Sequence, residues 1–160
     1  MIFAMEQAAV NLRYLQEHSL FGGVTREKIQ AVIPLLEEVT FPAGTFILRQ
    51  GDFEDRIYFL VEGSVEVLKH ESTEPGREKR IALIPEGETF GEMEFIEPES
   101  CAATIRSLEP IRALTLSNSA LYKIFQMDPE TFTLIILNLA RLIVRRMRKL
   151  QHIIMCGVPD

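Results

Sequence analysis

Residues 41–70 read FPAGTFILRQGDFEDRIYFLVEGSVEVLKH, and the pattern of this stretch indicates β structure. Short runs of aromatic, aliphatic and β-branched residues are separated in it by turn residues at 42–44, 50–52 and 62–63. Over residues 64–69 apolar and polar side chains largely alternate, which is the period of a strand with one buried face. The stretch therefore predicts hairpins of short antiparallel strands.

More runs of this kind follow along the chain. A polar loop at 70–79 leads to the run RIALI, a turn at 85–88, and the runs AATIRSL and IRALTL, which Glu109-Pro110 separates. About eight short strands at intervals of roughly ten residues favour a closed antiparallel barrel or roll. The predicted fold class is α+β, mainly β.

Helical patterns flank the β region on both sides. A first helix ends before Phe21-Gly22-Gly23, and Thr25 is the expected N-cap of a second helix over 26–38 that bends at Pro34. A short helix over 117–125 is followed by Asp128-Pro129-Glu130, a cap with proline at the first helical position, and a long helix to about Met155. We expect one domain, 1–160, built from a helical segment at 1–38, a roll at 39–116 and a helix pair at 117–155.

The long helix carries two apolar stripes. One follows the alternating steps of four and three that define a coiled-coil seam, and predicts a homodimer through Ile136, Ala140, Ile143, Met147, Leu150 and Ile154. The other is confined to the first half of the helix, where it can cover the barrel, and consists of Phe132, Ile135, Leu139 and Leu142.

Composition points to one globular domain. The chain has 160 residues, of which 47% are hydrophobic, and no apolar run approaches the roughly 20 residues of a membrane helix. We therefore expect a cytoplasmic protein without a transmembrane segment. The net charge of -6 is uneven, because residues 141–149 hold five basic side chains and the rest holds 12 basic against 23 acidic ones. Cys101 and Cys156 lie far apart and are expected to be free thiols.

Residues 90–104 read FGEMEFIEPESCAAT, which completes a recognisable order of motifs with FPAGTFILRQGD and IYFLVEGSVEVL. In this order and spacing they resemble the cyclic-nucleotide-binding domain of the catabolite activator and protein kinase A regulatory family. The resemblance covers nearly the whole chain. It implies a jelly-roll-like β-roll, or double-stranded β-helix, flanked by helices, with a phosphate-binding cassette that begins at Phe-Gly-Glu.

The family's cassette is similar to F-G-E-[LM]-[AG]-L, a short helix, and P-R-x-A-T. By this resemblance Gly91 lets the backbone approach the phosphate, and Glu92 accepts a hydrogen bond from the ribose 2'-hydroxyl. The ligand-binding set that it implies in this chain is Phe90, Gly91, Glu92, Met93, Glu94, Cys101, Ala102, Ala103 and Thr104.

The chain departs from the family's pattern at three positions of the cassette. Cys101 stands at the arginine position, Ser100 at the proline before it, and Glu94 at the small residue. Loss of a bidentate, charged hydrogen-bond partner costs about 1.5 to 3 kcal/mol. If Glu94 faces the pocket it excludes a cyclic phosphate, and if it faces water the loss is smaller. The sequence predicts weak or absent binding of cyclic AMP or cyclic GMP, with Arg146 as a candidate replacement cation.

Other interpretations of these residues stay open beside this one. The glutamates 92, 94, 97 and 99 are a candidate calcium or magnesium site, although a solvated loop is favoured. Cys101 is a candidate redox sensor with a lowered pKa, although a role as a small buried packing residue is favoured. The basic run 141–149 could bind an anionic membrane or an acidic partner, although a role as complement to the helix dipole is favoured.

We find no pairing of residues that suggests an enzyme. This sequence ends in HIIMCGVPD, which is too short for a helix-turn-helix, so no such DNA-binding unit is expected in it. The predicted function is a non-enzymatic regulatory or sensing module that dimerises through its final helix. The competing class is a structural interaction module with a protein partner and no small-molecule ligand. We expect no metal and no certain cofactor, a cyclic nucleotide being the candidate ligand.

Overall fold

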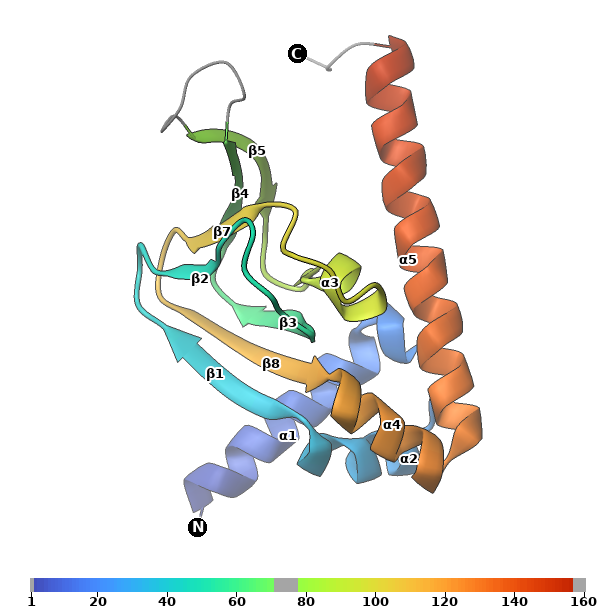
Figure 1. The fold of residues 1–160 in the computed structure, drawn as a ribbon. Helices are drawn as coiled ribbons and strands as arrows, with labels where there is room; N and C mark the ends of the chain where they lie inside the picture. Colours follow the sequence, from blue (N-terminus) through green and yellow to red (C-terminus); the bar gives the residue numbers. More distant parts are fainter. Residues whose placement is uncertain (1, 71–77, 157–160) are drawn as a thin grey trace. The chain divides into compact units, whose positions relative to one another are not determined.

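The computed structural model describes residues 2–70 and 78–156, with side chains over 8–70 and 78–155. Figure 1 shows its helices and strands. In chain order the elements are α1 Ile2–Glu17, η1 Ser19–Phe21, α2 Arg26–Val32, η2 Ile33–Leu35, β1 Glu37–Phe41, β2 Phe46–Leu48, β3 Arg56–Glu62, β4 Val65–His70, β5 Glu78–Ile84, β6 Thr89–Phe90, α3 Glu92–Ile96, β7 Thr104–Ser107, β8 Ile111–Ser117, α4 Asn118–Met127 and α5 Pro129–Cys156.

The described chain forms two compact units. A helical unit is made of Met1–Ile33 together with Ile124–Asp160, and a roll unit is made of Pro34–Lys123. The two ends of the sequence, which were expected as separate flanking segments, thus belong to one unit. The boundary between the units falls inside α4.

The roll unit contains two four-stranded sheets with antiparallel pairing. Their strand orders are β1-β8-β3-β6 and β2-β7-β4-β5. Residues 57–61 of β3 and 111–116 of β8 are all buried, because these strands lie in the middle of the first sheet. The core between the strands is made of Leu48, Tyr58, Leu60, Val65, Phe90, Cys101, Ile105, Ile111 and Ala113. The predicted mainly β roll of about eight strands with a C-terminal helix is confirmed.

The N-terminal part of the roll differs from the prediction. The second helix was expected to reach Glu38, but α2 ends at Val32 and a 3-10 turn follows over Ile33–Leu35. Proline at position 34 has no N–H to give to a helix. Glu37 and Glu38 then belong to β1, where they pair with Thr115 and Leu114 of β8. Strand pairing therefore overrides the helix propensity of the two glutamates.

Two predicted helix starts are confirmed. The Thr25 hydroxyl accepts a hydrogen bond from the Lys28 N–H at 3.4 Å, and caps α2. Asp128 caps α5, accepting from the Glu130 N–H at 3.3 Å and from the Thr131 hydroxyl. The Lys28 ammonium lies 2.9 Å from the Asp128 carboxylate and also pairs with Glu130. These contacts join the starts of α2 and α5 inside the helical unit.

Asn138 ties α5 to the N-terminal part of the helical unit. This side chain is buried, and its Nδ2 donates to the carbonyls of Leu20 at 3.1 Å and Gly22 at 2.8 Å. Ile135 and Leu139 of the second apolar stripe are buried in α5 as well, and the structure gives this stripe a partner that the sequence did not suggest, η1.

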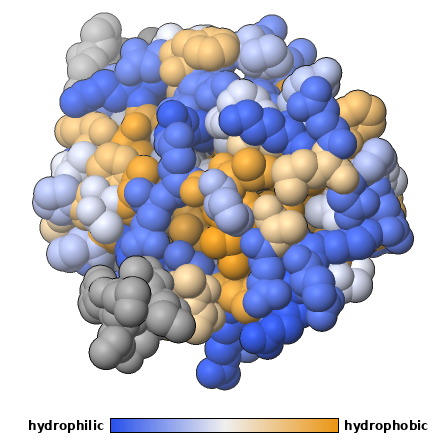
Figure 2. All heavy atoms as spheres, turned by 90° about the horizontal axis from the view of Figure 1, so that it is seen from below, coloured by the Kyte–Doolittle hydropathy of each residue, from blue (hydrophilic) through white to orange (hydrophobic). Residues whose placement is uncertain are grey.

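The predicted coiled-coil seam is largely exposed in the single chain. The exposed fractions are 38% for Ile136, 54% for Met147, 59% for Leu150 and 80% for Ile154, whereas Ile143 is half-buried. Apolar side chains also reach the surface elsewhere, and Figure 2 shows one face where they gather, in orange, between polar ones in blue. In the described part of the chain, the helices are too short or too polar to cross a membrane.

Candidate ligand-binding site

The entry to the cassette is fixed by an aromatic stack and a glycine. The buried ring of Phe90 stacks on Tyr58, with centroids 4.7 Å apart and an angle of 7° between the planes. Gly91 follows at φ +80, and a Cβ placed there would lie 2.5 Å from the Arg56 carbonyl oxygen. A side chain at position 91 is thus excluded both by the backbone conformation and by the close approach to β3.

The helix α3 turns two carboxylates inward. Glu92 and Glu94 are buried, at 8% and 9% exposure, together with Phe95. Met93 is 63% exposed, unlike its neighbours Glu92 and Glu94 in α3. A buried carboxylate is stable only where hydrogen bonds replace the water that it loses. For Glu94 this hydrogen bond comes from the Ala102 N–H, so the Glu94 carboxylate organises the cassette from within.

Glu94 binds the backbone of the same cassette. Its Oε1 accepts a hydrogen bond from the Ala102 N–H at 3.0 Å. Of the two orientations left open by the sequence, the structure has the inward one. The contact spans α3 and the segment before β7, and so closes the loop that contains Glu97 and Glu99. These two glutamates are exposed, unlike Glu92 and Glu94, so the four do not converge on one point.

Cys101 is held in place by its own backbone. Its N–H donates to the Asp52 carbonyl at 2.7 Å, and its carbonyl accepts from the Gly51 N–H at 2.9 Å. The thiol is 2% exposed. Burial, and then the negative charges of Glu94, Glu54 and Asp52, raise its pKa to about 11. The hypothesis of a lowered pKa was wrong, because the thiol is buried and acids lie near the position where a cation was expected.

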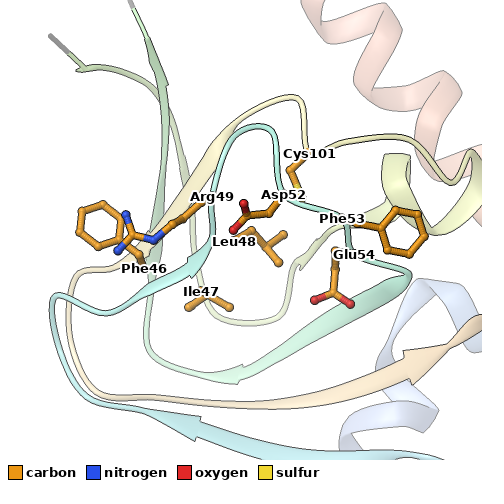
Figure 3. A pocket seen from close by; sticks show the side chains of 8 residues that line it. All are labelled: Phe46, Ile47, Leu48, Arg49, Asp52, Phe53, Glu54 and Cys101. Carbon is orange, nitrogen blue, oxygen red and sulfur yellow. The ribbon is translucent and has the colours of Figure 1, made fainter. Parts of the chain in front are cut away.

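A cavity of about 210 Å³ opens beside Cys101. Figure 3 shows Asp52, Glu54 and the thiol on one side of it, while the Arg49 side chain extends the other way, to Phe46. The Arg49 guanidinium lies 4.3 Å from the centre of that ring. The remaining side chains that line the cavity are Ile47, Leu48 and Phe53.

Sequence reasoning missed the two acids of this cavity. Asp52 was assigned to a turn and Glu54 to no role, since nothing in their spacing indicates that the loop before β3 meets Cys101. Glu54 is held by the Tyr58 hydroxyl, which donates to its Oε2 at 3.0 Å. Burial raises the pKa of Tyr58, and the Glu54 charge raises it further, so this hydroxyl remains a donor. In the described residues no group of three or more His, Cys, Asp or Glu side chains could hold a metal ion.

The end of the cassette passes into the sheet and α3 reaches α4. The buried Thr104 hydroxyl accepts a hydrogen bond from the Gln50 N–H at 3.0 Å, and so links β7 to the segment after β2. The Ala102 side chain is exposed and that of Ala103 is half-buried. The Phe95 carbonyl accepts a hydrogen bond from the Asn118 side-chain amide at 2.9 Å. The cassette helix is therefore bonded directly to the first residue of α4.

A comparison against protein-family models agrees with the fold. The model of the cyclic nucleotide-binding domain matches residues 38–128, and the chain belongs to this family. A relative from Mycobacterium tuberculosis, a CRP-like cAMP-activated global transcriptional regulator, is 26% identical over 91% of this chain. The chain spans 64% of the length of that regulator, less than two thirds.

Solved structures share the fold. A cyclic nucleotide-binding domain from Methylobacillus flagellatus is 22% identical, with a TM-score of 0.83 over 97% of this chain and 86% of that one. The regulatory subunit of a cAMP-independent protein kinase A from Trypanosoma brucei is 22% identical, with a TM-score of 0.69 over 87% of this chain and 48% of that one. That structure is a triple mutant bound to cAMP in the A site.

Proposed function

We propose that this chain is a non-enzymatic regulatory module of the cyclic nucleotide-binding family whose cassette does not bind cyclic AMP or cyclic GMP appreciably. The observation that carries the proposal is the acid-lined position of Cys101. In place of a guanidinium, the cassette has a neutral thiol between the carboxylates of Glu94, Glu54 and Asp52. Regulatory relatives support the non-enzymatic class, because they include a transcriptional regulator and a cyclic AMP receptor protein.

The charges around the cassette disfavour the binding of a phosphate. The missing guanidinium forfeits about 1.5 to 3 kcal/mol, or roughly tenfold to a few hundredfold in affinity. A carboxylate about 4 Å from a phosphate charge repels it by about 4 kcal/mol at an effective dielectric constant of about 20, before screening. Glu94 is inside the cassette rather than in water, so this repulsion adds to the missing attraction.

The trypanosome protein offers independent support. Its cAMP-bound form carries a Glu-to-Ala substitution, a Thr-to-Arg substitution seven residues later, and a Val-to-Ala substitution at the next residue. In this chain Glu94 and Cys101 are also seven residues apart, and Ala102 follows. The spacing supports the view that an acid and a missing arginine at these two positions go together with independence from cyclic AMP.

A thermal-shift titration tests the proposal. A ligand at 100 times its Kd adds about 2.7 kcal/mol, which for a domain of this size is a rise of roughly 5 to 10 °C in melting temperature. We expect no rise with cyclic AMP or cyclic GMP at 1 mM. A saturable rise with either nucleotide would refute the proposal and would direct attention to another cation such as Arg146.

We also propose that α5 forms a homodimer. The exposed seam residues Met147, Leu150 and Ile154 favour it, because a heptad stripe left in water is stabilised by a second copy. Replacing Ile143 and Leu150 with Glu should give a monomer in light scattering. The matched control carries Glu at Arg148 and His152, which are exposed positions of α5 on the side away from the seam, and should keep the dimer mass. Equal masses for the two variants would remove this proposal.

The output of the module is proposed to pass through α4. The bond between the Phe95 carbonyl and Asn118 joins the cassette helix to the segment 117–129, which we propose as the hinge before α5. A change in the cassette would thereby bias two arrangements of the final helix. If no ligand engages the cassette, the dimer surface serves a protein partner instead.

A further inference from the structure

Within the proposed function, and resting on it, we infer that Glu94 is a built-in anion that occupies the backbone amide of Ala102, a position that the family resemblance assigns to ligand binding. The side chain then has two consequences. It excludes an anionic ligand, and it holds the cassette closed without one. On this view Glu94 determines specificity together with Cys101, because a cyclic phosphate requires a change at both positions.

The first step is that the backbone of the cassette is already fully engaged around position 101. The Cys101–Ala102 peptide uses both of its polar groups, since its carbonyl accepts from the Gly51 N–H at 2.9 Å and its N–H donates to Glu94 Oε1 at 3.0 Å. The Cys101 N–H is engaged too, at 2.7 Å from the Asp52 carbonyl. The N–H groups of Cys101 and Ala102 are therefore not available to an incoming anion unless one of these hydrogen bonds breaks.

The second step is the chemistry of the acceptor. A carboxylate and a phosphate present the same kind of atom to an N–H, a negatively charged oxygen at hydrogen-bond distance. The Ala102 amide has one proton, so a phosphate oxygen gains it by displacing Glu94. At 9% exposure Glu94 cannot turn into water without movement of α3, and a displaced carboxylate would remain beside the incoming phosphate. The Glu94 carboxylate therefore binds the Ala102 N–H in preference to a ligand phosphate.

The third step concerns what an arginine at position 101 would meet. Glu94 is hydrogen-bonded to the next residue, so its carboxylate lies where it can pair with a guanidinium on that side chain. The pair would neutralise the new charge inside the protein. Cys101→Arg alone supplies a cation that Glu94 captures, and Glu94→Ala alone supplies an amide with no cation. Both changes together create an anion site.

A four-member mutant cycle tests this inference by equilibrium dialysis with cyclic AMP. We expect no measurable binding by the wild-type chain or either single variant, and binding by the double variant at least about a hundredfold tighter than by Cys101→Arg. A matched control combines Cys101→Arg with Glu97→Ala, which removes an exposed acid three residues further on, and should bind no better than Cys101→Arg. Equal affinity of Cys101→Arg and the double variant would overturn the inference, as would a folded double variant that does not bind.

Hydrogen exchange of the Ala102 amide gives a second readout that needs no ligand. Glu94→Ala should speed exchange roughly tenfold or more, since the amide loses its acceptor. Glu94→Gln keeps an oxygen acceptor and should retain most of the protection. Unchanged exchange in Glu94→Ala would overturn the inference while leaving the proposed function intact. Tight binding by the wild-type chain would instead refute the proposed function itself.

Discussion

Gly91→Ala should be among the most damaging single-methyl additions in the roll, and its penalty has two separable parts. The residue sits at φ +80, and the added Cβ would lie 2.5 Å from the Arg56 carbonyl oxygen and 3.3 Å from the Tyr58 ring. The Arg56 atom belongs to the backbone of β3, which pairs with both β6 and β8 and cannot shift locally.

The magnitude follows from these two terms. An alanine in the left-handed region costs about 1 to 2 kcal/mol. Forcing a methyl group into a packed site costs a further 1 to 3 kcal/mol or so. Gly87 provides the matched control, because it has φ +88 but nothing within 4 Å of the added Cβ, so its substitution carries the first term alone.

Equilibrium unfolding in urea measures both variants. We expect Gly91→Ala to lose roughly 2 to 5 kcal/mol and Gly87→Ala roughly 1 to 2 kcal/mol, with similar denaturant slopes. Equal losses in the two variants would show that the approach of Gly91 to the β3 backbone is not rigid, and the account of the cassette entry would fail with it.

Three further predictions concern other parts of the chain. Because the pKa of Cys101 rises from 9.0 to about 11, iodoacetamide at pH 8 should alkylate it roughly 100-fold or more slower in the folded than in the urea-unfolded chain, as followed by peptide mass spectrometry; similar rates would contradict the buried position. Hydrogen bonds from Thr131 and Lys28 lower the pKa of Asp128 below its ordinary 3.8, so the stability advantage of wild type over Asp128→Asn should be full at pH 6 and vanish as the pH falls below 3.8; an advantage independent of pH would exclude the effect. Asn138→Ala removes the hydrogen-bond donor of the Leu20 and Gly22 carbonyls, and should lower the free energy of unfolding by roughly 2 to 3 kcal/mol in a denaturant titration. A loss near zero would indicate that water replaces the amide.

The sequence predicted those parts of the fold that depend on local chemistry. Thr25 and Asp128 marked helix starts because a side-chain oxygen near the first turn accepts an N–H whatever the rest of the chain does. The alternation over 64–69 similarly indicated a strand. Glu37 and Glu38 were misassigned because their pairing with Thr115 and Leu114 is about 80 residues away, beyond the reach of local propensity.

The candidate site was predictable in its residues and unpredictable in its contacts. Periodicity and motif order selected the segment 90–104, but a five-residue helix does not reveal which of its carboxylates faces inward. The bond from Glu94 to Ala102 depends on how the loop folds back over α3, and the nearness of Asp52 to Cys101 depends on a β2–β3 loop that meets it from elsewhere in the sequence.

Isothermal titration calorimetry of the wild-type chain with cyclic AMP measures directly whether the cassette binds this nucleotide. If the cassette is filled by its own carboxylate and lacks a guanidinium, no saturable heat should appear up to about 1 mM nucleotide, which corresponds to a binding free energy weaker than about 4 kcal/mol. A saturable isotherm with a Kd in the micromolar range would contradict the account.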